Sequence, residues 1–154
     1  MSQKTVTDSI TVDAPPAVVF AILAAPRQHA RIDGSGSVGS VISGPDRLTR
    51  TGQRFAVRMK LFGVPYVISN RVVEFEEDRR IAWRHFTPNR WRYELVPTAD
   101  GGTMVTETFD WTCAGPVTRA VVERTGFPER NRDAIGATLV RLKQAAEADP
   151  RARG

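Results

Sequence analysis

Apolar and polar residues alternate through most of the middle of the chain, with the period of a half-buried β-strand. Along residues 53–61, the apolar positions are Phe55, Val57 and Met59, and each is flanked by arginine, lysine or alanine. Similar or more continuously apolar segments occupy residues 5–12, 38–43, 66–75, 80–86, 91–96 and 103–112, with turn-forming residues between most of them. Because the middle segments are joined by short turns, the sequence predicts an antiparallel sheet of about seven strands that closes beside its first strand.

Two short helical segments are predicted after the first strand. Pro15 and Pro16 suit the entry of a helix over residues 18–23, which ends before Pro26. A second helical piece is expected at residues 27–32. The sequence therefore predicts a strand and a helical pair before any hairpin.

The sequence of the C-terminal region predicts a long helix that the sheet must cover. A short helix over residues 117–124 is followed by a break at residues 126–128, which we interpret as a hinge, and then by a long helix over about residues 128–148. The long helix carries an apolar stripe formed by Ile135, Leu139, Leu142 and Ala146. A curved sheet is the natural cover for this stripe, so the predicted fold class is α+β.

Length and composition fit a globular protein with one domain. The chain has 154 residues, of which 41% are hydrophobic and 25% charged. We expect a single domain over residues 1–154 with flexible ends at about 1–4 and 149–154. The polar N-terminus lacks an apolar signal region, so a cytoplasmic location is the simplest expectation. Exposed strand edges are compatible with a monomer or a homodimer.

The formal net charge of +5 raises the question of a nucleic-acid partner. The basic residues are mostly arginines, scattered along the chain and interleaved with acidic residues, as in residues 74–80 and 129–133. This pattern is typical of a solvated mixed-charge surface, so no nucleic-acid partner is expected.

Few residues suit phosphate or metal chemistry. The glycine-rich segment 33–39 lacks the lysine of a nucleotide-binding loop and precedes a strand, which favours a tight turn over a phosphate cradle. Cys113 is the lone cysteine, so no internal disulfide can form, and we interpret it as a small packed side chain. With two histidines and one cysteine, neither a metal site nor a cofactor is expected.

The order of elements, and several local strings, resemble a known superfamily. The strings are ITVDAPPAVVF at residues 10–20, HARIDGSG at 29–36, VVEF at 72–75 followed by RIAW at 80–83, GGTMVT at 101–106 and LVRLK at 139–143. Across essentially the whole chain, the sequence resembles the START-like SRPBCC superfamily with its helix-grip fold, and in particular its polyketide cyclase/dehydrase-type members from actinobacteria. One departure is Glu77-Asp78, where many relatives have a proline before the following strand.

The resemblance implies a cavity between the concave face of the sheet and the long helix, in which members hold sterols, lipids, polyketides or other apolar molecules. Strand parity nominates the side chains that would line it, together with one at the helix break: Phe55, Val57, Met59, Tyr66, Ile68, Asn70, Trp83, His85, Trp91, Tyr93, Phe109, Trp111 and Phe127. The alternative is that the aromatic residues among them only pack the helix. Asn70, together with Glu74 on the same parity, would make the interior polar enough for a ligand with polar handles.

His85 is the candidate for acid–base chemistry, because the unperturbed pKa of histidine lies near neutrality. Its partner would be a carboxylate, with four alternatives: Glu74, Glu94, Glu107 and Asp110. His29 is expected at the surface or at the mouth of the cavity.

Three functions remain open on the sequence. The first is binding of a small hydrophobic ligand. The second is a polyketide cyclase/aromatase or dehydratase-type enzyme that uses polar residues of the cavity. The third is a regulatory or partner-binding module. Fold alone does not decide among them.

Overall fold

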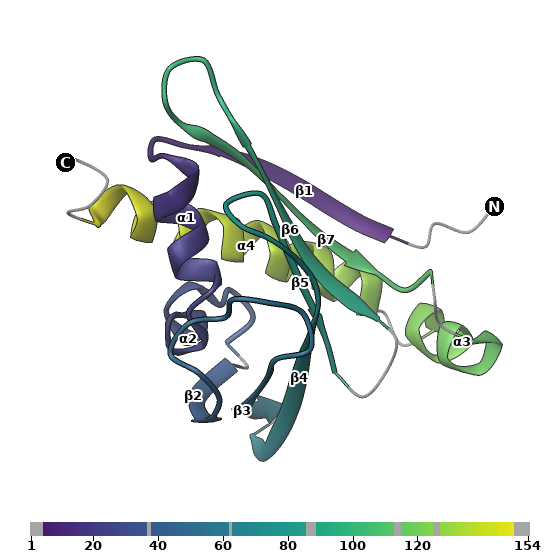
Figure 1. Ribbon diagram of the computed structural model, residues 1–154. Coiled ribbons are helices and arrows are strands. Elements are labelled where there is room, and N and C mark those ends of the chain that lie inside the picture. The colour runs from purple at the N-terminus through teal and green to yellow at the C-terminus, as the bar shows by residue number, and fades with distance from the viewer. Residues whose placement is uncertain are drawn as a thin grey trace.

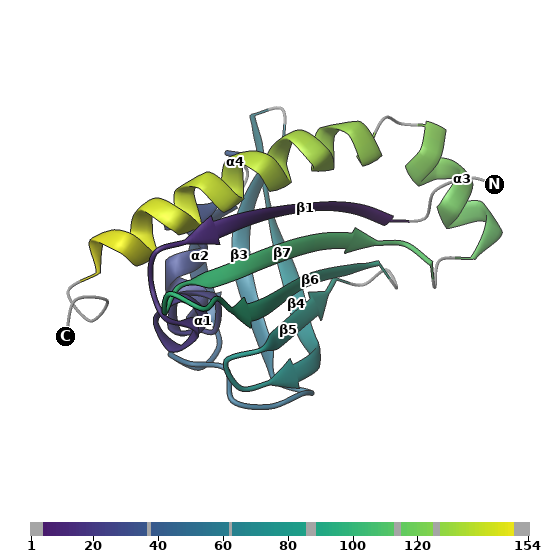
Figure 2. The ribbon, with the colours of Figure 1, turned by 90° about the horizontal axis from the view of Figure 1, so that it is seen from above.

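Seven antiparallel strands form one curved sheet around the C-terminal helix (Figures 1 and 2). The computed structural model describes residues 5–36, 38–61, 63–85, 89–112, 115–124 and 127–149. The strands are β1 (Thr5–Val12), β2 (Val38–Ser43), β3 (Arg54–Leu61), β4 (Val64–Glu76), β5 (Arg80–Arg84), β6 (Arg90–Pro97) and β7 (Thr103–Asp110). Their order in the sheet is β1-β7-β6-β5-β4-β3-β2, so the predicted meander that closes beside the first strand is confirmed.

The helical pair after β1 consists of α1 (Pro16–Leu23), the 3-10 turn η1 (Pro26–Gln28) and α2 (His29–Ile32). α1 begins at a proline, whose fixed φ and missing N–H suit the first turn of a helix. Most of its side chains are buried in the same core cluster as Leu48, whose N–H donates to the carbonyl of Ala24 at 2.7 Å. The pair therefore forms one end of the core.

α3 (Pro116–Arg124) and α4 (Phe127–Ala148) complete the chain. Figure 2 shows α4 running along β1, with α3 standing beyond one end of the sheet. The predicted stripe of α4 is confirmed, since Ile135, Leu139, Leu142 and Ala146 are fully buried. α4 also packs against β7, α1 and α2, and this arrangement is the helix-grip fold.

A glycine lets α2 approach α4. A Cβ added to Gly34 would lie 2.5 Å from both the Cβ of Ala137 and the backbone nitrogen of Thr138. Instead, Gly34 N–H donates to Thr138 Oγ1 at 2.9 Å. The carboxylate of Asp33 accepts bonds from the N–H groups of Ser35 and Val38, so the segment is held as a tight turn. Gly36 adopts a φ of 75° in this turn, as its sequence predicts.

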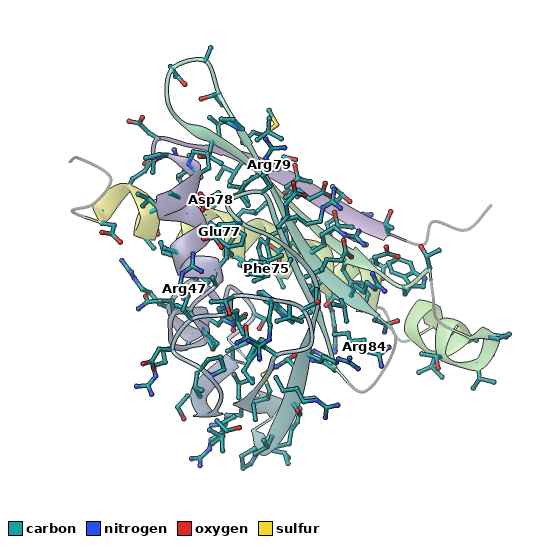
Figure 3. The ribbon with its side chains drawn as sticks, viewed as in Figure 1. Arg47, Phe75, Glu77, Asp78, Arg79 and Arg84 are labelled. Atoms are coloured by element: carbon teal, nitrogen blue, oxygen red, sulfur yellow. The ribbon has the colours of Figure 1, made fainter. Side chains whose placement is uncertain are left out.

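The turn between β4 and β5 is tied to the loop that precedes β3. Arg47 lies beside Glu77 in Figure 3, and their side chains form an ion pair at 2.5 Å. The Arg47 guanidinium also lies 5.9 Å from the ring centre of Phe20, which meets Phe75 edge to face. Asp78 takes the left-handed conformation in this turn, with a φ of 61°.

Candidate functional site: the inner face of the sheet

The side chains nominated by strand parity share the concave face that we call the inner face. Residues directly opposite each other in an antiparallel pair lie on the same face. In the β3–β4 pair, the opposed residues include Phe55 and Asn70, Val57 and Ile68, and Met59 and Tyr66. Across β5, β6 and β7, the Trp83, Trp91 and Phe109 positions follow one another in the same way, and Tyr93 faces Ile81.

Contacts between rings gather the aromatic side chains of this face into two clusters. Trp83 lies 5.7 Å from Phe55 and 5.6 Å from Tyr93, measured between ring centres. Phe109 lies 4.7 Å from Trp91 and 5.5 Å from Trp111. Trp83 and Trp91 are directly opposite each other in the β5–β6 pair, so the two clusters are neighbours, and we call them together the aromatic wall. The side chain of Phe127, and with it the proposed hinge, lies outside the described residues, as do Cys113 and the chain ends 1–4 and 150–154.

His29 is part of this wall, which corrects the expectation that it lies at the surface or the mouth. The ring is buried, stacks on Trp83 at 4.7 Å and meets Phe55 edge to face at 5.4 Å. Its Nε2–H donates to the carbonyl of Leu23 at 2.8 Å. Burial lowers the pKa of His29 to about 4, although the backbone bond opposes the shift. His29 is thus neutral at pH 7 and joins α2 to the sheet.

His85 is paired with an amide and not with a carboxylate. Its Nδ1 lies 2.6 Å from Asn70 Oδ1, so the ring donates Nδ1–H to the amide oxygen and carries its lone pair on Nε2. Burial lowers the pKa of His85 to about 4. The ring is only partly buried, and a neutral imidazole at neutral pH is a hydrogen-bond acceptor and a weak base.

Glu107 is the most unusual group on the inner face. Its side chain is 3% exposed, and Oε1 accepts a hydrogen bond from the hydroxyl of Tyr93 at 2.7 Å. Oε2 is buried and has no hydrogen-bond partner among the residues that the structure describes. Burial raises the pKa of Glu107 to about 8; the Tyr93 bond opposes this shift, while the carboxylates of Asp33 and Asp8 add to it. Burial, reinforced by Glu107, likewise raises the pKa of Tyr93.

Glu107 was nominated from the sequence only as one possible partner of His85. A signal for a larger role was present, because Val105, Glu107 and Phe109 share one parity in the last strand. A charged residue in the middle of an inward apolar stripe indicates a buried polar site when the strand is short and central. The pairing with Tyr93 depends on the β6–β7 register, which the sequence alone does not give.

Glu74 points away from the inner face, and the parity argument that placed it inside is wrong. The register of the β4–β5 pair shifts between Val72 and Glu74, because β4 has one extra residue at this point. The bulge turns Glu74 to the outer face, where it binds Arg92 at 2.8 Å and Arg90 at 3.0 Å. Burial alone would raise the pKa of Glu74, but the hydrogen bonds from these arginines outweigh it and lower the pKa.

Asp110 and Glu94 also lie on the outer face. Asp110 binds Arg92 at 3.4 Å and Glu94 lies 3.7 Å from Arg80. Of the four carboxylates considered as partners for His85, only Glu107 therefore faces inward. Within the described part of the chain, no group of three histidine, cysteine, aspartate or glutamate side chains is arranged to hold a metal ion.

Two surface grooves are present outside the aromatic wall. One, of about 440 Å³, lies where the glycine-rich turn meets β2 and the β3–β4 hairpin, and Met59 contributes to its lining. The other, of about 450 Å³, lies on α3 and is lined by Pro116, Val117, Ala120, Val121 and Arg124. Neither groove is lined by Trp83, Trp91 or Glu107.

None of the helices described is both long and apolar enough to cross a membrane.

Relatives in sequence are mycobacterial. The chain is 42% identical over 139 residues to the uncharacterized protein Rv0088 of Mycobacterium tuberculosis, and this match covers 89% of the chain. It is 41% identical to the uncharacterized protein MT0096 of another strain of that species. The chain spans 62% of the length of each of these relatives.

Solved structures from other bacteria share the fold. Protein NE0264 of Nitrosomonas europaea superposes with a TM-score of 0.69 at 20% identity, covering 94% of this chain and 96% of that one. The Polyketide_cyc-like protein Cgl2372 of Corynebacterium glutamicum gives a TM-score of 0.60 at 20% identity, covering 96% and 94%.

A family model described as polyketide cyclase / dehydrase and lipid transport matches residues 3–147. This match spans nearly all of the described structure and agrees with the helix-grip architecture. The chain therefore belongs to the polyketide cyclase/dehydrase and lipid transport family, within the START-like SRPBCC superfamily.

Proposed function

We propose that this protein binds a small, mainly apolar molecule against the inner face, and that Glu107 donates a hydrogen bond to an oxygen atom of that molecule. The observation that carries the proposal is the buried Oε2 of Glu107, for which the described part of the chain provides no hydrogen-bond partner. Leaving such a group without a partner costs about 1–3 kcal/mol. A ligand oxygen, or a water that a ligand displaces, would supply the missing partner.

The protonation state of Glu107 determines whether its free oxygen donates or accepts a hydrogen bond. With a pKa of about 8, the carboxyl is mostly neutral at pH 7. Because Oε1 accepts from Tyr93, the proton belongs on Oε2, which becomes a donor. A ligand carbonyl, ester or hydroxyl oxygen can accept a hydrogen bond from this donor. A ligand carboxylate would be repelled by the nearby carboxylates of Asp33 and Asp8.

The aromatic wall supports an apolar body for the ligand. Phe55, Trp83, Trp91 and Phe109 offer flat faces, and several of them are only partly buried or lie beside partly buried neighbours. Together with the family's description, this supports a lipid, a polyketide or a molecule of similar polarity as the ligand class.

Catalysis is the second candidate function, and one observation favours it. The inner face holds a neutral carboxylic acid, Glu107, and a neutral imidazole, His85. Burial raises the pKa of Glu107 and lowers the pKa of His85. An acid and a base on one face are what a cyclase or dehydratase of the family would use. The third reading, a regulatory or partner-binding module, needs neither group.

The experiment compares the wild type with Glu107→Met and Glu107→Gln. Native mass spectrometry of protein purified from its own host would first identify a bound species, and a thermal-shift panel of lipophilic compounds would follow. Glu107→Met removes the donor and is expected to weaken binding roughly tenfold, whereas Glu107→Gln keeps an N–H donor and retains most of the affinity.

Two results would contradict the proposal. If no species is bound and no compound shifts the melting temperature, the ligand-binding role is wrong and the partner-binding reading is favoured. If Glu107→Met binds as tightly as the wild type, Glu107 is not the polar anchor. The catalytic candidate is tested on the same proteins with a poly-β-ketone substrate, and equal turnover by the wild type and His85→Ala would remove His85 from it.

A further inference from the structure

The outer face of the sheet carries a set of cations that we call the cationic face. It consists of Arg54, Arg58 and Lys60 on β3, Arg71 on β4 and Arg84 on β5. The three β3 residues alternate with inward-facing Phe55, Val57 and Met59, so they point to the opposite side of the sheet. All but the partly buried Arg84 are exposed.

Three arginines of the cationic face lie opposite one another, so their like charges destabilise the sheet. Arg54 is directly opposite Arg71, which is directly opposite Arg84, so like charges follow one another across three neighbouring strands. Directly opposed residues have Cβ atoms roughly 5 Å apart, and like charges at this spacing destabilise a sheet. Such a row calls for a role other than holding the sheet together.

Internal acidic groups do not neutralise this row. The carboxylates of the outer face, Glu74, Glu94 and Asp110, are engaged by Arg80, Arg90 and Arg92. Among the described residues, none of the five side chains of the cationic face forms an ion pair. Figure 3 shows Arg84 lying at the far end of β5 from the Arg47 and Glu77 pair. An external anion is therefore the charge complement that this face lacks.

The tip of the β3–β4 hairpin adds exposed apolar side chains, with Val67 on the cationic face and Val64 and Tyr66 on the opposite face of the hairpin. Val64 is 62% exposed, Val67 is 58% exposed and Tyr66 is 36% exposed. Val67 lies directly opposite Arg58 in the β3–β4 pair. Figure 1 places this hairpin at the lower edge of the molecule, away from α3 and from both ends of the chain.

We propose that the cationic face and the hairpin tip dock this protein on an anionic membrane surface. Basic side chains attract anionic headgroups, and neighbouring aliphatic and aromatic side chains enter the boundary between headgroups and acyl chains. A nucleic acid would neutralise the arginines but offers no apolar layer to exposed valines. The combination of the two kinds of side chain on one hairpin favours a bilayer over a phosphate chain.

The groove of about 440 Å³ strengthens the assignment, because Arg58, Met59, Lys60 and Pro65 are among the residues that line it. A groove of this size lies within the range of small-molecule sites. Docking through the hairpin would place it at the lipid surface. The docking surface nevertheless does not depend on the proposed ligand, since a chain that binds no ligand could still dock.

The test is co-sedimentation of the full chain with vesicles of phosphatidylcholine alone or with about 30% phosphatidylglycerol, at about 0.1 M NaCl. Each cation near an anionic surface raises binding roughly fivefold, so the double variant Arg58→Gln/Lys60→Gln is expected to bind roughly 25-fold more weakly. The matched control is Arg132→Gln/Arg141→Gln, which removes the same charge from exposed positions of α4. It is expected to bind within about twofold of the wild type.

A Val67→Ser variant isolates the apolar contribution, and it is expected to weaken the binding that remains at about 0.5 M NaCl. The proposal is overturned if the wild type binds neither vesicle, if it binds both equally, or if the two double variants lose binding equally. Tighter binding to a single-stranded RNA than to the anionic vesicles, at the same salt concentration, would overturn it in favour of a nucleic acid. Because no ligand is added, failure here leaves the Glu107 site untouched.

Discussion

Glu107 makes the stability of this protein depend on pH in a direction opposite to that of most carboxylates. Its folded-state pKa is raised from the ordinary 4.5 to about 8. A group whose pKa is raised by folding binds its proton more tightly in the folded state, so its contribution is complete below the unfolded pKa. The contribution is lost as the pH rises from about 4.5 through 8.

The size of the effect follows from the same pKa difference. One pKa unit corresponds to about 1.4 kcal/mol, so the shift from 4.5 to about 8 is worth about 5 kcal/mol in full. Between pH 5 and pH 8, the free energy of unfolding is expected to fall by about 3–4 kcal/mol through this group. That is a large part of the total stability of about 5–15 kcal/mol for a domain.

The two histidines act in the opposite direction. The pKa values of His29 and His85 are lowered from 6.5 to about 4. Their contribution is complete above pH 6.5 and is lost as the pH falls towards 4. Wild-type stability is therefore expected to be greatest near pH 6.5. A comparison with a Glu107 variant isolates the contribution of Glu107, because both proteins carry the same contribution from the histidines.

Glu107→Gln provides that comparison, because glutamine has nearly the same shape and stays neutral. Urea unfolding of both proteins at pH 5, 6, 7 and 8 and constant ionic strength gives the difference in the free energy of unfolding at each pH. We expect the variant to gain about 3–4 kcal/mol relative to the wild type from pH 5 to pH 8. The control is Glu94→Gln on the outer face, where the side chain is 42% exposed and the difference should stay within about 0.5 kcal/mol. Parallel pH profiles for the wild type and Glu107→Gln would refute the assignment of a buried, neutral Glu107.

Two further predictions concern the packing of α4. Gly34→Ala is expected to destabilise the protein by about 1–3 kcal/mol in urea unfolding, because the added Cβ would lie 2.5 Å from the backbone nitrogen of Thr138. The control is Gly115→Ala, where nothing lies within 4 Å of the added Cβ, and its stability should be unchanged. Equal losses in the two variants would contradict the close approach of Gly34 to α4. Leu139→Ala in the buried stripe is expected to cost about 3–5 kcal/mol, against less than about 1 kcal/mol for Val140→Ala next to it, which is 47% exposed; a small loss at Leu139 would mean that the stripe is not covered.

The fold could be predicted from the sequence because its signals are local. Alternation along β3 gave the inward positions Phe55, Val57 and Met59, and helical spacing gave the stripe of α4. Short turns gave the order of the strands, since neighbouring hairpins leave few other topologies. The same parity failed at Glu74, where the bulge in β4 reverses the alternation.

The polar part of the site could not be predicted, because it depends on register and on burial by distant segments. Tyr93 meets Glu107 only through the β6–β7 register. His29 is buried because α2 packs under the sheet at Trp83, a contact between positions far apart in the chain. Neither the partner of a polar side chain nor its pKa can be read from its own neighbours in sequence.

One extra residue in β4 links the two faces of the sheet. Without the bulge, Glu74 would lie opposite Ile81 on the inner face and would add an ionised carboxylate beside the aromatic wall. The bulge moves it outward, where it holds Arg90 and Arg92. Its carboxylate therefore neutralises those two arginines and forms no ion pair with Arg54, Arg71 or Arg84. The same local irregularity therefore keeps the inner face mainly apolar and supplies the outer face with the carboxylate that pairs with Arg90 and Arg92.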